Sequence, residues 1–386
     1  MNPFIFNCPT KVCFAEGSSS SVAEHLADLG AKSPFIITDE FLLKNNIIAP
    51  AVSALEERFG KVGVYSDVPS DSDLECINKV AKTAKDAGAD SMVAIGGGSV
   101  IDTAKVVNIC LSLGGDILSH QGLNALDSKL FPLIVIPTTA GTGSEVSYVA
   151  MIKHHVEKRK IVFGSKFLAP DIALLDPLMQ LSLPAKLTAA TGMDALTHAI
   201  ESIVCEITGS SFSDALAIEA ARMIFKWLPI ATADGGDVEA RSNMLVASCM
   251  AGCAFSNAGV GVVHALAHST GARFNTHHGL TNAIFLPHGM RFNQSVAAAK
   301  YAQLSRQLGF SKNLDDNECT ATLIDSVENL LKQLNLPSRL ELIGVPKLNE
   351  SELQEWANDA VDDPSTMFNP KELSVQDAIE IYKRAY

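Results

Sequence analysis

Hydrophobic and polar positions change their period near residue 180 of the chain. Before that point, short runs of β-branched and apolar residues alternate with longer amphipathic stretches. The clearest apolar runs are 35–38, 91–95 and 133–137, and the clearest amphipathic stretches are 74–87 and 100–112. Short apolar runs are typical of buried strands, and amphipathic stretches of this length are typical of helices. Their alternation predicts a parallel, Rossmann-like sheet with crossover helices.

The second half of the chain has a different pattern. From Leu187 onward, apolar residues recur at helical spacing, β-branched runs are few, and Gly and Pro mark the loops. A chain of 386 residues is long enough for two hydrophobic cores. We therefore expect an α/β domain over residues 1–182 and an all-helical domain over residues 183–386.

Composition and charge exclude several classes of function. Hydrophobic residues make up 47% and charged residues 19% of the chain, which indicates a folded globular protein. The net charge of −13 argues against a surface for nucleic acid or anionic membranes. Eight cysteines without a CxxC motif, a start without a basic region and the lack of a long apolar run predict a cytoplasmic protein with reduced thiols.

Two polar loops follow predicted strands in the α/β half. The first, Gly96–Ser99, joins a strand to a helix, so that its backbone N–H groups could hold a pyrophosphate. It is not the GxGxxG fingerprint, and turns of this kind also occur as plain connections. The second, Pro137–Glu145, has hydroxyls and glycines that could surround a nucleotide or only cap the next helix. Two such loops at two strand ends favour nucleotide binding.

Asp39 follows the strand at residues 35–38. A carboxylate at a strand tip can bind ribose hydroxyls and repel a 2′-phosphate, which would favour NAD over NADP. On spacing alone, a solvated turn residue is an equal interpretation.

Acidic and imidazole side chains gather in the helical half. Asp194 and His198 lie four residues apart, so that a helix places them on one face. One carboxylate with several imidazoles suits a divalent first-row metal that keeps an open coordination position. Spacing alone does not say which of the later histidines are ligands. The candidates are His264, His268, His277, His278 and His288.

In order and over essentially the whole length, these motifs resemble those of the iron-containing (group III) alcohol dehydrogenase family. The matching segments are GGGSVIDTAK at 96–105, PTTAGTGSE at 137–145, GMDALTH at 192–198, VHALAH at 263–268, HGLTNAIFLPH at 278–288, NPK at 369–371 and IY at 381–382. The resemblance implies a dehydroquinate synthase-like fold, in which an NAD-binding α/β domain precedes a helical domain that binds metal and carries the catalytic residues.

The resemblance also implies roles for particular residues. His268 would stay free of the metal, near the nicotinamide, as a proton relay, and Val149 and Phe255 would line the substrate pocket. The metal, Fe²⁺ or in its place Zn²⁺ or another divalent ion, would be bound by Asp194, His198, His264 and His278. Cofactor contacts are implied at Asp39, Ser70, Gly97, Gly98, Ser99, Asp102, Thr138, Thr139, Thr142 and Lys160. The chain departs from the family at Ser70, where Asn is more common, at His277, often Pro, and at Gly289, often Val.

The predicted function is therefore hydride transfer between NAD(H) and a small primary alcohol or aldehyde. A carbon–oxygen lyase on the same scaffold, like dehydroquinate synthase, would need more basic residues near the ligand motifs than Arg273 and Arg291. A non-catalytic NAD-binding assembly protein would not need the ligand set or His268. Apolar segments at 4–6 and 11–14 predict an N-terminal hairpin whose exposed edge joins a homodimer or higher homo-oligomer.

Overall fold

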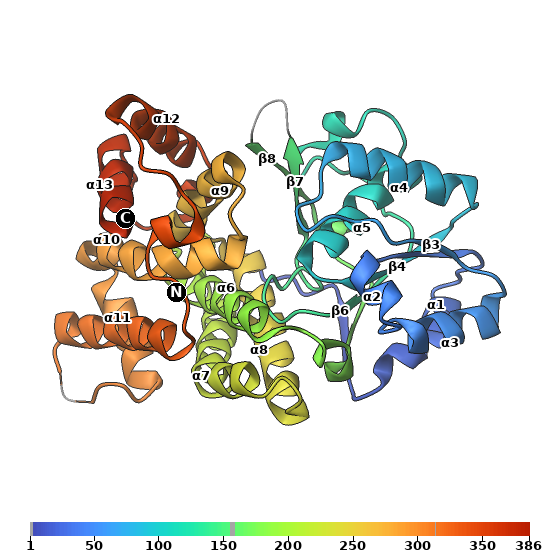
Figure 1. The fold of residues 1–386 in the computed structure, drawn as a ribbon, viewed down its shortest axis with the longest axis horizontal. Coiled ribbons are helices and arrows are strands. Elements are labelled where there is room, and N and C mark those ends of the chain that lie inside the picture. Colours follow the sequence, from blue (N-terminus) through green and yellow to red (C-terminus); the bar gives the residue numbers. More distant parts are fainter. Residues whose placement is uncertain (1–2, 155–158, 313) are drawn as a thin grey trace. The chain divides into compact units, whose positions relative to one another are not determined.

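The computed structural model describes residues 3–154, 159–312 and 314–386. These residues divide into two compact units, one formed by Cys8–Leu183 and the other by Pro184–Tyr386 with the N-terminal segment that ends at Asn7. The first unit is α/β and the second is helical (Figure 1). The predicted fold class is confirmed.

The larger sheet of the α/β unit is parallel throughout. Among the described residues it has six strands in the order β1-β9-β6-β4-β2-β3. The strands are β1 (Lys11–Phe14), β2 (Pro34–Ile37), β3 (Gly63–Tyr65), β4 (Ser91–Gly96), β6 (Leu133–Pro137) and β9 (Ile172–Leu175).

Helices cover both faces of this sheet because its central strands are apolar on both sides. Val93 and Ile95 of β4 pack with α1 and α3, whereas Met92 and Ala94 pack with α4 and α5 on the opposite face. This alternation follows the two-residue period of a strand. The helices are α1 (Val22–Asp28), α2 (Glu40–Lys44), α3 (Ala49–Phe59), α4 (Leu74–Asp86) and α5 (Gly98–Ser112), with short 3₁₀ turns η1 (Ser18–Ser21), η2 (Ile117–His120), η3 (Lys166–Leu168) and η4 (Pro177–Gln180).

The chain leaves two adjacent strands of the sheet toward opposite faces. After β2 it runs into α2 and α3, and after β4 it runs into α5, which covers the other face. Open parallel sheets bind ligands at such a switch point, outside the carboxyl ends of the strands. Asp39 and Gly97 follow β2 and β4, so the fold places two predicted cofactor residues at the switch point.

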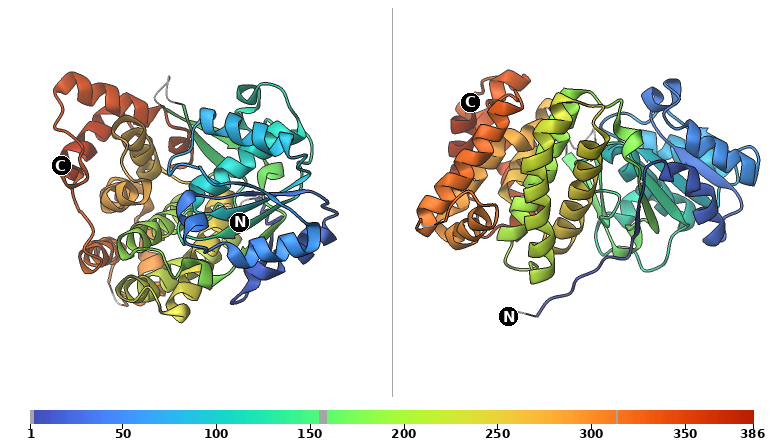
Figure 2. Two further views of the ribbon diagram at one scale, coloured as in Figure 1. Left: turned by 45° about the vertical axis from the view of Figure 1, so that its right-hand side comes forward. Right: turned by 90° about the horizontal axis from the view of Figure 1, so that it is seen from below.

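Two features of the α/β unit differ from the sequence-based expectation. A small second sheet contains β5 (Gly122–Leu123), β7 (Val149–His154) and β8 (Arg159–Gly164), with β7 and β8 antiparallel. The predicted N-terminal hairpin is wrong: β1 pairs in parallel with β9, and the residues before it form an extended segment (Figure 2). Lys11–Phe14 pairs with a distant buried strand instead of a local apolar segment.

The helical unit is a set of long helices around a core helix. Helix α6 packs against α7, α8 and α10, and α10 packs in turn against α9, α11 and α13. The elements are α6 (Ala185–Val204), α7 (Ser211–Ala233), α8 (Val238–Ala258), α9 (Val262–Phe274), α10 (His278–Gln307), α11 (Asp316–Gln333), η5 (Leu340–Ile343), α12 (Glu350–Val361), η6 (Pro364–Phe368) and α13 (Val375–Ala385).

No single helix in the described part of the chain has the length and apolar composition of a membrane span. Helices α8 and α9 reach that length and composition only as a pair, and they meet at a bend of 101°.

Candidate metal centre and nucleotide-binding loops

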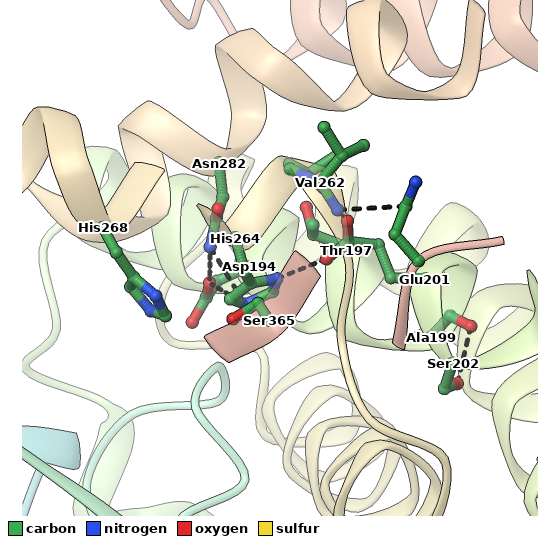
Figure 3. Close-up of polar contacts among 12 residues, drawn as sticks. Asp194, Thr197, Ala199, Glu201, Ser202, Val262, His264, His268, Asn282 and Ser365 are labelled. Atoms are coloured by element: carbon green, nitrogen blue, oxygen red, sulfur yellow. Dashed lines mark hydrogen bonds and ion pairs between the residues drawn. The ribbon is translucent and has the colours of Figure 1, made fainter. Parts of the chain in front are cut away.

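The candidate metal centre is built from helices α6, α9 and α10 of the helical unit (Figure 3). Asp194 and His198 lie in the middle of α6, where every residue from Gly192 to Val204 is buried. His264 lies in the first turn of α9, and His278 is the first residue of α10. Two ligand candidates thus come from a core helix and two from the first turns of neighbouring helices.

The candidate ligand atoms converge at distances that suit one cation. Asp194, His198 and His264 each offer an atom within 4.8 Å of the others, and all three residues are buried. Oδ1 of Asp194 lies 4.0 Å from Nε2 of His264 and 3.5 Å from Nε2 of His278. Ligand atoms at about 2.0–2.2 Å from a tetrahedral metal lie roughly 3.3–3.6 Å apart. The structure therefore brings together the four residues that the family resemblance implies as ligands.

The candidate ligand atoms share a single hydrogen-bond donor, the side-chain amide of Asn282, which cannot satisfy all of them. Nδ2 of Asn282 lies 2.6 Å from Oδ1 of Asp194, 3.2 Å from Nε2 of His264 and 3.1 Å from Nε2 of His278. An amide nitrogen has two hydrogens and cannot donate fully to three acceptors. Its partner atom, Oδ1 of Asn282, is buried and accepts no hydrogen bond in the described part of the chain. The donor set therefore fits a divalent cation.

Glu201 contacts the side of the His264 ring that faces away from the candidate metal position. It was not predicted as a site residue. Its Oε2 lies 2.5 Å from Nδ1 of His264, and its Oε1 accepts a hydrogen bond from the backbone N–H of Val263 at 2.7 Å. A carboxylate on Nδ1 fixes the tautomer that leaves Nε2 free to bind metal. Burial lowers the pKa of His264, but the hydrogen bond and charge of Glu201 outweigh burial and raise that pKa above its ordinary value.

The remaining histidine candidates lie outside this set. His277 is exposed and caps α10, where it accepts a hydrogen bond from the backbone N–H of Leu280 at 3.4 Å. His288 lines a cavity of about 280 Å³ with Arg291 and Lys371. Burial and the charge of Arg291 lower the pKa of His288 to about 4.

Gly289 has a steric explanation. A Cβ atom at this position of α10 would lie 2.4 Å from Cγ2 of Val263. The glycine allows α10 to approach the first turn of α9 closely, next to His264. A valine here would require the side chains of Val262 and Val263, or the two helices, to shift.

His268 lies one turn after His264 on α9 and has a carboxylate partner of its own. Its Nδ1 lies 3.0 Å from Oδ2 of Asp363, and its ring stacks on that of His278 with the centroids 5.3 Å apart. Asp363, which precedes η6, was not predicted. Burial favours its protonated form, but the charge of His268 and hydrogen bonds from His268 and Ser365 lower the pKa of Asp363 below its ordinary value.

The two predicted substrate-pocket residues belong to different units. Phe255 lies on α8 and stacks on His198, with the ring centroids 4.3 Å apart and the planes at 19°. Val149 is the first residue of β7 and is half-buried. Phe255 is thus a neighbour of the metal centre, and the pocket formed with Val149 remains a prediction.

In the α/β unit, the two predicted nucleotide-binding loops contact each other. Gly97 caps α5, and a Cβ atom on Gly98 would lie 2.5 Å from Cγ2 of Thr142. The backbone N–H of Thr138 donates to the carbonyl of Gly96 at 3.0 Å. Glycine is therefore required at Gly98 by close packing between the loops. The first hydrogen bonds of α5 are donated by Val100 and Ile101 to the carbonyl of Gly97, so the N–H groups of Gly98 and Ser99 precede the helical pattern and suit an anionic ligand.

A buried lysine holds the second loop in place. Lys105 is fully buried, and its Nζ lies within hydrogen-bonding distance of Oγ of Ser144, at 3.1 Å, and of the carbonyl of Val149, at 2.9 Å. Burial lowers the pKa of Lys105 to about 8, against the opposing charges of Asp102 and Glu145. Burial raises the pKa of Glu145 to about 7. Lys105 and Glu145 were not predicted as site residues.

Asp102, a predicted cofactor contact, ties three elements of the unit together. It accepts hydrogen bonds from Oγ of Ser144 at 2.5 Å and from the backbone N–H of Met151 at 2.9 Å. Burial raises its pKa, and the charge of Lys105 opposes that effect. Both carboxylate oxygens thus hold the protein together, and a contact with the cofactor remains a prediction.

The other predicted cofactor residues surround the same strand ends. Asp39 caps α2 by accepting from the backbone N–H of Leu42 at 3.0 Å through one oxygen, Oδ1. The carbonyl of Ser70 accepts a hydrogen bond from the hydroxyl of Ser99. Lys160 lies on β8, with its Nζ 3.2 Å from Oδ1 of Asp71.

A parallel sheet with a glycine-rich turn at its switch point, followed by a helical unit with a carboxylate–imidazole cluster, is the combination that a metal-dependent, nucleotide-linked dehydrogenase requires. Residues 9–177 match the family described as iron-containing alcohol dehydrogenase, and residues 188–386 match its C-terminal family. The chain belongs to the iron-containing alcohol dehydrogenase family.

Similar proteins match along almost the entire chain. The NAD-dependent methanol dehydrogenase of Bacillus methanolicus is 34% identical over 98% of this chain and 99% of its own. The probable alcohol dehydrogenase EutG of Escherichia coli (strain K12) is 36% identical over 98% of this chain and 94% of its own. A solved structure of 1,3-propanediol oxidoreductase superposes with a TM-score of 0.95 at 31% identity, covering 100% of both chains.

Proposed function

We propose that the chain is an NAD-linked, metal-dependent alcohol dehydrogenase that transfers hydride between NAD(H) and a small primary alcohol or aldehyde. The observation that carries this proposal is the convergence of Asp194, His198, His264 and His278 in a chain of the iron-containing alcohol dehydrogenase family. Membership of this family favours hydride transfer over the lyase and over a non-catalytic assembly protein.

The proposed metal is Fe²⁺, or Zn²⁺ or another divalent ion in its place. Asp194, His198, His264 and His278 would hold it, and Glu201 would orient His264. A divalent cation at this point would supply Lewis acidity, which favours loss of the alcohol proton and polarises a carbonyl. Neutral imidazoles and one carboxylate leave net positive charge on such a cation, which suits that chemistry.

The α/β unit would hold the dinucleotide. Gly97, Gly98 and Ser99 at the start of α5 present backbone N–H groups for the pyrophosphate. Asp39 uses Oδ1 to cap α2, and its other oxygen would accept from a ribose hydroxyl and repel a 2′-phosphate. NAD is the hydride carrier, as the name of the Bacillus methanolicus relative states for that protein. The other proposed contacts are Ser70, Asp102, Thr138, Thr139, Thr142 and Lys160.

His268 is the proposed proton relay. It lies one turn from His264, its side chain is 12% exposed, and its Nε2 makes no hydrogen bond in the described part of the chain. A neutral imidazole in this position would accept a proton released from the alcohol and transfer it to solvent.

For the substrate, we propose a short unbranched primary alcohol or its aldehyde. Val149 and Phe255 would contribute apolar surface, and a second substrate hydroxyl without a partner there would cost about 1–3 kcal/mol. That cost corresponds to roughly tenfold or more in kcat/KM against a matched diol. One similar structure is named as a 1,3-propanediol oxidoreductase, so kcat/KM for 1-propanol should be compared directly with kcat/KM for the propanediols.

Assembly as a homodimer or higher homo-oligomer is also proposed. β1 is the edge strand of its sheet in the described structure, and Val12 and Phe14 on it are exposed. Such an edge can pair with another chain. Light scattering at assay concentration should give at least twice the 41.0 kDa mass of the chain, and a monomeric mass would contradict the proposal.

We also propose a cytoplasmic location, because the cysteines are free thiols. All eight cysteines are free thiols, and six of them lie at buried or half-buried positions of helices and strands. Proteins that keep free thiols in this number are typical of reducing compartments.

One experiment tests the proposed function. Purified protein reconstituted anaerobically with Fe²⁺, Zn²⁺ or no metal is assayed with NAD(H) and NADP(H) on a panel of alcohols and aldehydes. We expect metal-dependent turnover with NAD(H), and a higher kcat/KM for 1-propanol than for either propanediol. No turnover under any metal condition would contradict the function, and equal or better use of the diols would contradict only the proposed pocket.

A further inference from the structure

The contacts of Asp363 divide its two oxygens between two donors. Oδ1 accepts a hydrogen bond from the backbone N–H of Ser365 at 2.9 Å, because Asp363 is the N-cap of η6. Oδ2 lies 3.0 Å from Nδ1 of His268. The side chains of Asp363 and His268 are both 12% exposed, so little solvent competes for either contact.

An ionised carboxylate can only accept hydrogen bonds. The imidazole of His268 must therefore carry its proton on Nδ1 when it faces Asp363, which leaves a lone pair on Nε2. In the described part of the chain, no lysine or arginine forms an ion pair with Asp363, so His268 is the side chain that Oδ2 faces.

The ring of His268 is also held in orientation by its neighbours. It stacks on the ring of His278 at a centroid distance of 5.3 Å and meets the ring of His264 edge-on at 5.7 Å. A fixed ring with a fixed tautomer presents Nε2 beside the candidate metal ligands in the form that accepts a proton.

We propose that Asp363 is a positioning residue that fixes the tautomer of His268 and so keeps Nε2 ready to accept the substrate proton. This proposal rests on the proposed function for the identity of that proton. Asp363 is assigned no contact with substrate or cofactor and acts through His268.

The structure predicts an unusual order of mutational effects. In Asp363→Asn, the amide oxygen must remain on Ser365 N–H, because only the oxygen can accept that bond. The amide nitrogen then faces His268 and donates to Nδ1, which moves the imidazole proton to Nε2 and removes the acceptor. In Asp363→Ala, no group enforces either tautomer. The isosteric change to asparagine should therefore harm the reaction more than the truncation to alanine.

The test compares Asp363→Asn, Asp363→Ala and the control Asp362→Asn, which makes the same charge change at the exposed neighbouring residue. Reconstituted Asp363→Asn should lose about 100-fold or more in kcat, within the range general acid–base catalysis contributes, with KM changed by less than about twofold. Asp363→Ala should lose roughly tenfold, and Asp362→Asn should match the parent. Metal content should be equal in all four proteins.

A second readout does not depend on turnover. ¹⁵N NMR of histidine-labelled, zinc-loaded protein, with His268 assigned by His268→Gln, should show Nδ1 protonated in the parent and Nε2 protonated in Asp363→Asn. An unchanged tautomer, or a smaller loss of kcat in Asp363→Asn than in Asp363→Ala, would overturn the proposal. A parent without alcohol or aldehyde turnover would instead overturn the proposed function, and the tautomer measurement would still decide the role of Asp363.

Discussion

The two polar centres of the chain balance buried charge in opposite ways. Around the predicted nucleotide-binding loops, the chain supplies its own cation, because Lys105 lies fully buried near Asp102 and Glu145. In the candidate metal centre, Asp194 and Glu201 are 2% and 3% exposed, and in the described part of the chain neither forms an ion pair with lysine or arginine.

This difference shows what each centre needs in order to be stable. Buried charges are costly unless they are paired or bind a metal. Lys105 belongs to the chain itself, and its charge interacts with those of Asp102 and Glu145, so it contributes to folding of the α/β unit. Among the described residues, the polar partners of these side-chain carboxylates are histidines, an asparagine and a backbone N–H. Neutral histidines do not balance these buried charges, so we infer that a bound metal ion supplies the positive charge.

The largest effect should follow from removing a metal ligand. His264→Ala and His278→Ala should abolish metal binding and lower kcat by about 1,000-fold or more, since the Lewis acid is lost. Circular dichroism should show a largely intact fold, and His25→Ala in the α/β unit should behave like the parent. Elemental analysis with full metal occupancy in both ligand variants would contradict the ligand assignment.

Removing the cation that the chain supplies should affect stability and spare the metal. Lys105→Met leaves Asp102 and Glu145 without their buried counter-charge, so we expect the free energy of unfolding to fall by about 3–5 kcal/mol. Lys79→Met, on the exposed face of α4, should change it by less than about 0.5 kcal/mol. Chemical denaturation measures both. If Lys105→Met lost its metal while its stability was unchanged, the result would contradict the assignment of Lys105 to stability of the α/β unit.

A smaller effect is expected from the carboxylate behind His264. In Glu201→Gln, the amide oxygen must accept from Val263 N–H, so the amide nitrogen faces Nδ1 of His264 and favours the tautomer that cannot bind metal through Nε2. We expect metal affinity to fall about 10–100-fold, in the range typical of residues that orient a ligand. Competition with a metal chelator measures the affinity. An unchanged affinity would show that Glu201 serves only to cap α9.

The smallest effect concerns pH and the α/β unit. Burial raises the pKa of Glu145 from 4.5 to about 7, so between these values the folded state keeps a proton that the unfolded state releases. Ionising Glu145 therefore destabilises the fold increasingly as pH rises from 4.5 to 7, and the cost is constant above that. Relative to the parent, Glu145→Gln should gain about 1–3 kcal/mol between pH 5 and pH 8.

Urea denaturation at several pH values measures that difference. The exposed Glu57→Gln, in the same unit, should show no such pH dependence. A stability difference between Glu145→Gln and the parent that stays constant with pH would contradict the raised pKa.

Short-range sequence patterns predicted the central strands and one pair of candidate ligands, because neighbouring residues alone determine both. The apolar runs at 35–38, 91–95 and 133–137 are the strands β2, β4 and β6, because buried parallel strands need apolar residues on both faces. Asp194 and His198 could be paired from their four-residue spacing. Glu201, three residues after His198, lies on the same face of α6, but spacing did not distinguish it from an ordinary helix residue.

Long-range contacts explain what the sequence did not reveal. Asp363 follows His268 by 95 residues, and only the packing of η6 against α9 brings them together. The pairing of β1 with β9 joins segments about 160 residues apart, which a local apolar pattern cannot predict. The glycine at Gly98 was expected for a ligand, and the structure shows that Thr142 also requires it.

Titration of Fe²⁺ into metal-stripped protein under anaerobic conditions, followed by calorimetry, measures directly whether the helical unit binds a metal ion. We expect saturable binding of one Fe²⁺ per chain to the parent and its loss in Asp194→Asn, while Lys105→Met, assayed where it is still folded, retains it. No saturable binding to the parent, or equal binding to Asp194→Asn, would contradict the claim that the helical unit takes its positive charge from a metal.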